Sequence, residues 1–193
     1  MASDVDQTNP DFLQNLGASI GKLSVAMEGF SHSASHFRFI WDLQFTSMVE
    51  PKLKMIKEDD KRKLCYDYLD RFQLYLEPLV IGNKLRRSII HGDLNDMNML
   101  CDAKGKRVIA FLDFGDSKES CTVFDLAICI AYFMLNKSKE QSIRVLHQIS
   151  KAYHQMYRLT ESEIDALWVA VCSRILTSAV VGYEKILQRP ENS

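Results

Sequence analysis

The sequence lacks an excess of charge of either sign. Among its 193 residues, 24 lysines and arginines stand against 25 aspartates and glutamates, giving a formal net charge of -1. Proteins that bind DNA, RNA or anionic lipid by electrostatics usually display a strongly basic surface. We therefore expect no nucleic-acid partner and no membrane partner, so any partner must be recognised through local chemistry.

Paired cysteines and targeting segments are also lacking. The five cysteines, at positions 65, 101, 121, 129 and 172, form no Cys-x-x-Cys pair and no Cys/His ligand spacing. The first residues are polar and acidic, unlike the basic and apolar start of a signal or transit peptide. The apolar run 123–135 is too short to span a membrane, and we expect no longer run elsewhere. These features predict a cytoplasmic protein with reduced cysteines.

Helical periodicity marks most of the chain. Asn9, Pro10 and Asp11 read as a cap, a first-turn proline and a dipole-compensating acid. A capping box at 160–163 begins the last helix, and Pro78 should kink or end an earlier one. The expected helices cover residues 11–27, 59–79, 123–135, 138–157 and 161–187, while 31–50 should form a packed irregular connection.

The apolar period changes between Ile89 and Asp113. Two short apolar runs, 98–101 and 108–112, flank the turn-forming residues 102–106, which is typical of a β-hairpin. No internal repeat is visible. The sequence therefore predicts one α+β domain, mostly α, with helices around a small β-hairpin.

This hairpin carries residues suited to phosphoryl transfer. That reaction needs a divalent metal, oxygen ligands for it, and a carboxylate that aligns the attacking hydroxyl. Asp93 follows an apolar run and could accept the proton of a hydroxyl, while Asn98 offers an amide oxygen. Antiparallel pairing should bring Asp113 beside Asn98, and Gly115 should let the backbone turn sharply after it. Two metal ligands would then converge near Asp93.

Three nearby residues have structural and functional interpretations. We expect His91 to brace the loop by hydrogen bonding rather than to act as an acid or base. Asp125 opens an apolar stretch and must find donors, for instance backbone N–H groups of the catalytic loop. Arg174 lies in an equally apolar context, so it either pairs with a protein acid or grips a substrate carboxylate.

The motifs HGDLNDMNML and FLDFGDS resemble the signature of the aminoglycoside phosphotransferase family of kinase-fold enzymes. The resemblance implies a protein-kinase-like C-terminal lobe and transfer of the γ-phosphate of GTP or ATP with Mg²⁺. Carried over by position, Asp93 becomes the catalytic base, Asn98 and Asp113 the metal ligands, and His91 and Asp125 the support of the catalytic loop.

The acceptor is expected to be a small molecule. Protein kinases usually carry Arg and Lys where this chain has Gly92 and Asn95. Further segments of the chain, among them HFRFIWDL and LWVAVCSRILTSAV, resemble members of the family that act on an amino-alcohol, with 5-hydroxy-L-lysine the expected acceptor. Asp116 and Arg174 are the candidate substrate-binding residues.

One part of the family pattern is missing. Kinase-fold enzymes cover the nucleotide with a strand-rich N-terminal lobe that supplies a phosphate-binding lysine. Residues 1–10 are polar and read as a flexible N-terminus, so residues 11–193 would form the C-lobe alone, with the N-lobe absent. We expect catalysis by such a truncated form to be impaired. The alternative is a non-catalytic binding module that pairs with a protein partner over the uncovered lobe surface.

Overall fold

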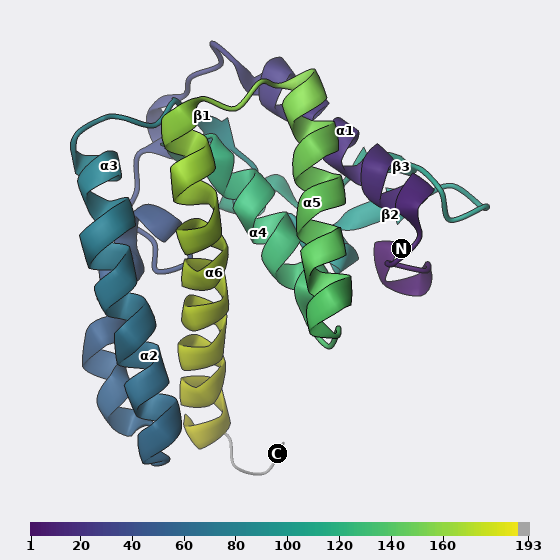
Figure 1. Cartoon of the computed structure of the whole chain (residues 1–193). Coiled ribbons are helices and arrows are strands. Elements are labelled where there is room, and N and C mark those ends of the chain that lie inside the picture. The colour runs from purple at the N-terminus through teal and green to yellow at the C-terminus, as the bar shows by residue number, and fades with distance from the viewer. Residues whose placement is uncertain (189–193) are drawn as a thin grey trace.

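The computed structural model describes residues 1–188 and is mostly helical (Figure 1). Two small antiparallel sheets lie among the helices, so the expected α+β, mostly α fold is confirmed. The main helices are α1 (Pro10–Met27), α2 (Asp59–Arg71), α3 (Glu77–Ile81), α4 (Val123–Met134), α5 (Lys139–Met156) and α6 (Glu161–Gln188). The connection from α1 to α2 contains the short 3₁₀ segments η2 (Ser33–Ser35) and η3 (Leu43–Met55), which matches the irregular region predicted there.

The core is built around α4 and α6. Ten of the twelve residues of α4 are buried, because it lies between α5 on one side and α6 on the other. Helix α1 packs chiefly on α5, and at Gly17 an added Cβ would lie 2.2 Å from the Ile149 carbonyl oxygen. Helix α6 separates this group from α2 and α3 (Figure 1). The sheet that contains residues 118–121 leads directly into the N-terminus of α4, and the other sheet contacts α1.

The strands form two sheets rather than the single hairpin predicted. Strands β2 (Met99–Cys101) and β3 (Val108–Phe111) make the expected hairpin. The second sheet pairs β1 (Arg87–Ile90) with β4 (Lys118–Cys121), with Ile90 opposite Lys118. We did not predict β4, because its sequence Lys-Glu-Ser-Cys is mostly polar and its partner lies far away in the chain. Strand β1 leads directly into the loop that contains Asp93, so this sheet helps to position that loop.

We expected Pro78 to kink the helix that begins at Asp59 or to end it early, but the helix continues past Pro78 to Ile81. A π-helical segment, η4 (Phe72–Leu76), joins α2 to α3. A proline has no N–H for the preceding turn, and widening that turn lets the ring fit without a steric clash. Helix α3 then ends at Ile81, before the short loop to β1.

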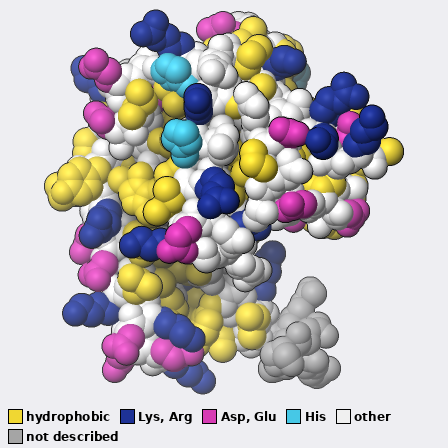
Figure 2. All heavy atoms as spheres, turned by 45° about the vertical axis from the view of Figure 1, so that its right-hand side comes forward, with side chains coloured by type: hydrophobic (Ala, Val, Ile, Leu, Met, Phe, Trp, Pro, Cys, Tyr) yellow, Lys and Arg dark blue, Asp and Glu magenta, His cyan; other side chains and the backbone are white. Residues whose placement is uncertain are grey.

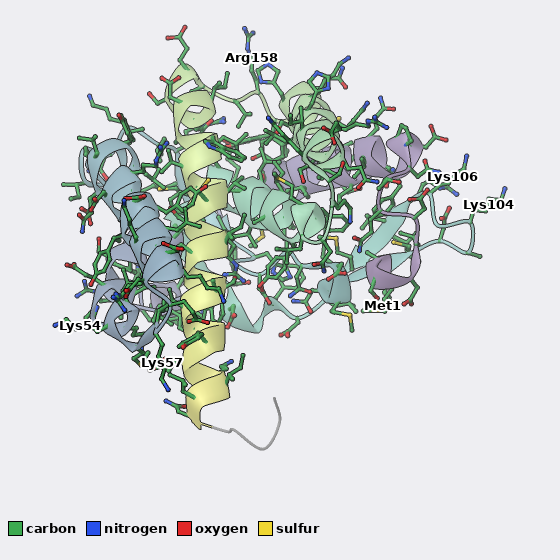
Figure 3. All side chains as sticks on the ribbon, turned by 60° about the horizontal axis from the view of Figure 1, so that its bottom comes forward. Met1, Lys54, Lys57, Lys104, Lys106 and Arg158 are labelled. Carbon is green, nitrogen blue, oxygen red and sulfur yellow. The ribbon has the colours of Figure 1, made fainter. Side chains whose placement is uncertain are left out.

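Residues 1–9 differ from the flexible N-terminus predicted. The 3₁₀ segment η1 (Ala2–Asp4) contacts β2 and η5 (Asp96–Asn98), and Ala2 is fully buried. Gln7 donates to the Asp96 carboxylate at 3.0 Å. Met1 lies at the same end of the molecule as Lys104 and Lys106 of the β2–β3 turn (Figure 3). Polar composition suggested a free segment, but this segment makes specific contacts beside the catalytic loop.

Helix α6 corrects a second expectation. By length and composition it could cross a membrane, whereas we expected no such run. In the structure, 61% of its most apolar window is buried, and Glu163 and Arg174 are buried with it. Packing against α4, η3 and α2 buries many of its apolar residues, whereas Ile164, Trp168 and Ile186 remain exposed. On the face drawn in Figure 2, side chains of both charge signs are interspersed with hydrophobic ones.

Candidate active site

The catalytic loop begins where β1 ends, and Asp125 of α4 anchors it by hydrogen bonds. The backbone N–H groups of His91 and Gly92 each donate to the Asp125 carboxylate at 2.8 Å. Asp125 is only 3% exposed, and burial raises its pKa despite these two hydrogen bonds. The contact expected between Asp125 and the catalytic loop is therefore present. It fixes the backbone that leads into Asp93.

His91 connects the loop to the end of β3. Its Nε2 lies 2.8 Å from the Leu112 carbonyl oxygen, and the Asp93 N–H donates to its Nδ1 at 3.3 Å. A carbonyl oxygen can only accept a hydrogen bond, so Nε2 must carry the proton. Nδ1 then carries no proton and accepts the hydrogen bond from Asp93. The ring also packs on Phe114, with centroids 4.6 Å apart. Because both nitrogens are engaged, His91 braces the loop and is not available as a base.

Asp93 is held by side chains on both carboxylate oxygens. Asn95 and Asn98 donate from their amide nitrogens to Asp93 Oδ2 at 2.8 and 3.2 Å. Asn98 also donates to the Asp93 carbonyl oxygen at 3.0 Å, which fixes which way its amide faces. The side chain of Asp93 is 24% exposed, so solvent or a ligand can reach it. Asn95, which stands where protein kinases usually carry Lys, was not predicted to contact Asp93, and it also caps η5.

Asp113 lies beside Asn98, as the hairpin register predicts. The Leu112 N–H donates to the Asn98 carbonyl oxygen at 2.9 Å, and Asp113 follows directly. The sharp turn occurs at Asp113 itself, with φ of 61°, and not at Gly115 as expected. A non-glycine residue in this region is strained and is often found at functional sites. Gly115 lies close to the Asp113 carboxylate. An added Cβ there would lie 3.2 Å from Asp113 Oδ1, a tight contact that the carboxylate would have to shift to relieve.

Asn98 and Asp113 are suitable ligands for Mg²⁺. The amide nitrogen of Asn98 is committed to Asp93, so its oxygen is free to face a metal, and the side chain of Asp113 is exposed. Magnesium prefers such hard oxygen ligands and keeps water and phosphate as the others. Within residues 1–188, no cluster of three or more His, Cys, Asp or Glu could hold a metal alone. A metal held by Asn98 and Asp113 would need further oxygen ligands, such as water or phosphate.

Arg174 follows the first of its two interpretations, pairing with a protein acid. Its Nη2 lies 2.5 Å from Asp93 Oδ1 and 2.9 Å from the Tyr132 hydroxyl. Arg174 and Tyr132 also line a pocket of about 270 Å³ between α4 and α6, together with Ala131, Leu135, Ile175, Ser178 and Ala179. Tyr132 was not foreseen, because an apolar helix gives no sign of which hydroxyl faces an active site.

Asp116 and Lys118 form a separate support for the loop. The Lys118 ammonium donates to the Asp116 carbonyl oxygen at 2.7 Å and is 1% exposed. Burial lowers the pKa of Lys118, against the attraction of nearby carboxylates such as Asp42. At Gly92, where φ is 82°, an added Cβ would lie 2.6 Å from Lys118 Nζ. Lys118 and the Asp116 carbonyl oxygen therefore lie close to Gly92 of the catalytic loop, and a role of Asp116 in substrate binding stays a prediction.

Comparison with known proteins agrees with this geometry. A family model described as the phosphotransferase enzyme family matches residues 2–160. The chain belongs to this family. Its catalytic loop and hairpin lie inside the matched range, and the resemblance recognised in the motifs is confirmed. Arg174 lies beyond the range.

Curated relatives are similar along nearly the whole chain. Hydroxylysine kinase of Mus musculus is 31% identical over 191 residues, covering 93% of this chain and 50% of the relative. The Xenopus laevis and Bos taurus proteins of the same name are 28% and 29% identical and cover 95% of this chain. The chain thus spans about half the length of the curated relatives it matches.

A solved structure shows the same fold. Amicoumacin kinase hAmiN, in complex with AMP-PNP, Ca²⁺ and Ami, aligns with a TM-score of 0.64 at 17% identity. The alignment covers 92% of this chain and 52% of that one. The kinase-like C-terminal lobe predicted for the fold is therefore confirmed.

Proposed function

We propose that this chain carries the acceptor and metal side of a small-molecule kinase, which transfers the γ-phosphate of GTP or ATP to a hydroxyl. The observation that carries the proposal is the hydrogen bond from Asn98 to Asp93 Oδ2, together with the backbone pairing of Asn98 with Leu112, the residue before Asp113. Asp93 would align the attacking hydroxyl and accept its proton, and the other two would hold Mg²⁺ bridging the phosphates. Membership of the phosphotransferase family supports the reaction type.

We propose 5-hydroxy-L-lysine as the acceptor. The support is the similarity to relatives named hydroxylysine kinase, which runs through most of this chain. Amicoumacin kinase, which shares the fold, was solved in complex with AMP-PNP and Ca²⁺, and this supports a nucleotide with a divalent cation as the phosphate donor.

The test is phosphate transfer by the 193-residue chain. Initial rates would be measured with Mg-GTP and Mg-ATP separately, with 5-hydroxy-L-lysine and lysine as acceptors. Transfer to the hydroxylated amino acid and not to lysine is the expected result, at the impaired rate expected of a C-lobe alone. Asp113→Asn should lower the rate by at least about 100-fold, because even the outer-shell partners of metal ligands are worth about 10–100-fold, while Asp165→Asn, at an exposed position of α6, should leave it unchanged.

The Asp93→Asn variant needs a folding control. Asp93 is the carboxylate that balances the buried Arg174, so an amide there leaves that cation without its anion. Circular dichroism and a thermal melt would separate lost chemistry from lost structure. Absence of transfer to any amino-alcohol by folded protein containing intact Asp93 would contradict the proposal for this chain and favour the binding-module alternative.

A further inference from the structure

Arg174 is buried against the base of the proposed kinase site. The residue is 2% exposed, in the middle of α6, and its guanidinium carbon lies 4.9 Å from the Trp41 ring centroid and 5.1 Å from that of Tyr132. Two aromatic faces at these distances hold the guanidinium between them by cation–π attraction. The cation is thus restrained before any hydrogen bond is considered.

The hydrogen bonds of Arg174 fix its remaining freedom. Nη2 carries two hydrogens, and the two acceptors within reach are Asp93 Oδ1 at 2.5 Å and the Tyr132 hydroxyl at 2.9 Å. Nη1 donates to the Trp41 carbonyl oxygen at 3.2 Å. Nε is buried without a partner among the described residues. The nitrogen nearest the reaction site is therefore fully used, which leaves it no hydrogen for a substrate carboxylate.

Asp93 is correspondingly restricted. A carboxylate has about four lone-pair sites. Oδ2 accepts from Asn95 and Asn98, and Oδ1 accepts from Arg174, so about one lone pair remains, on Oδ1. Rotation of the carboxylate would break the contact with Arg174. The remaining lone pair therefore has a fixed direction, which is what a base that aligns a hydroxyl requires.

We propose that Arg174, held by Trp41 and Tyr132, is a positioning residue that aims the Asp93 carboxylate at the acceptor hydroxyl. It acts through Asp93 and does not bind the acceptor. The inference rests on the proposed kinase function for its catalytic meaning, while the contact itself can be measured without turnover. Three parts of the chain that are distant in sequence, namely Trp41 shortly before η3, helix α4 and helix α6, would thus cooperate on one carboxylate.

The kinetic test compares Arg174→Gln with Arg144→Gln, the same change at an exposed position of α5. Misplacing a catalytic group by about 1 Å can cost about 100-fold in rate. We expect kcat to fall by about that factor in Arg174→Gln, with the KM values for acceptor and nucleotide changed less than about twofold. A raised acceptor KM with kcat preserved would instead identify Arg174 as a substrate ligand and overturn the proposal.

Tyr132→Phe provides a gentler variant in case Arg174→Gln does not fold. It removes one acceptor of Nη2 and leaves the ion pair with Asp93 in place. The expected result is a smaller loss, again in kcat before KM. An unchanged kcat in both Tyr132→Phe and folded Arg174→Gln would overturn the proposal.

A spectroscopic test works without turnover. Asn95 and Asn98 donate to the same carboxylate as Arg174, so their side-chain amide signals in a ¹⁵N-labelled chain report how Asp93 is held. Arg174→Gln and Tyr132→Phe should shift these signals, and Arg144→Gln should not. Shifted signals in a chain without turnover would refute the kinase function of this chain and leave the positioning contact standing. Turnover with unshifted signals would overturn the positioning role of Arg174 and leave the kinase function of this chain standing.

Discussion

Replacing Asp125 by Asn tests how firmly the catalytic loop depends on one buried carboxylate. The two side chains have nearly the same shape, so the substitution changes hydrogen bonding and charge without creating a cavity. In the native protein both carboxylate oxygens accept backbone N–H groups, those of His91 and Gly92, at 2.8 Å each. An amide has one accepting oxygen, and its NH₂ would face the other N–H.

The expected destabilisation follows from those two bonds. Loss of one hydrogen bond to a charged acceptor costs about 1.5–3 kcal/mol, and the stranded backbone N–H adds about 1–3 kcal/mol. The neutral amide recovers part of this, because burial disfavours the charged form of Asp125 and raises its pKa. We expect a net loss of about 3 kcal/mol. For a chain of this size that corresponds to a fall in Tm of about 6–12 °C.

Urea unfolding followed by circular dichroism measures this directly. The midpoint should fall while the m-value stays constant, because the surface exposed on unfolding is unchanged. Asp165→Asn is the matched control on the surface of α6 and should stay within about 0.5 kcal/mol of the native protein. A loss of less than about 1 kcal/mol in Asp125→Asn would refute the argument that this carboxylate anchors the loop.

Two further predictions concern the loop and the pH dependence. Gly92→Ala places a Cβ 2.6 Å from Lys118 Nζ at a φ of 82°, so it should lower stability by about 2 kcal/mol in urea unfolding, and an unchanged midpoint would contradict the contact. Burial raises the pKa of Cys121 from 9.0 to about 12, because the folded protein disfavours the thiolate. The unfolded chain therefore loses this proton first, so the folded protein is fully stabilised below pH 9 and loses stability as pH rises towards 12. Between pH 8 and pH 10, Cys121→Ala should therefore lose about 1 kcal/mol less stability than the native protein, and equal losses would exclude this cause.

Local sequence patterns predicted the parts of the structure that depend on neighbours in the chain. Helices α1, α5 and α6 follow from apolar spacing and from caps such as Asn9 and Thr160. The hairpin register brought Asn98 and Asp113 together because only a short turn separates their strands. The donors that Asp125 needs were deduced from its burial alone, since a carboxylate in an apolar helix must be satisfied.

Long-range pairings could not be predicted in the same way. Strand β4 has a mostly polar sequence, and its assignment depends on Ile90 lying opposite Lys118. A fully buried lysine is rare, so no pattern rule places Lys118 beneath the catalytic loop. The left-handed turn at Asp113 was assigned to Gly115 because glycine adopts that conformation most easily. In each case the local structure depends on tertiary contacts, and these cannot be predicted from the pattern of a single sequence.

The geometry of Asp93 depends on elements that come after it in the chain. Its backbone is anchored by Asp125 of α4, its loop is tied to the end of β3 through His91, and its carboxylate is held by Arg174 of α6. The motif around residue 93 therefore specifies the chemistry, whereas three later segments specify the orientation. A change in the middle of α6 should consequently alter the rate of transfer without changing any residue of the motif.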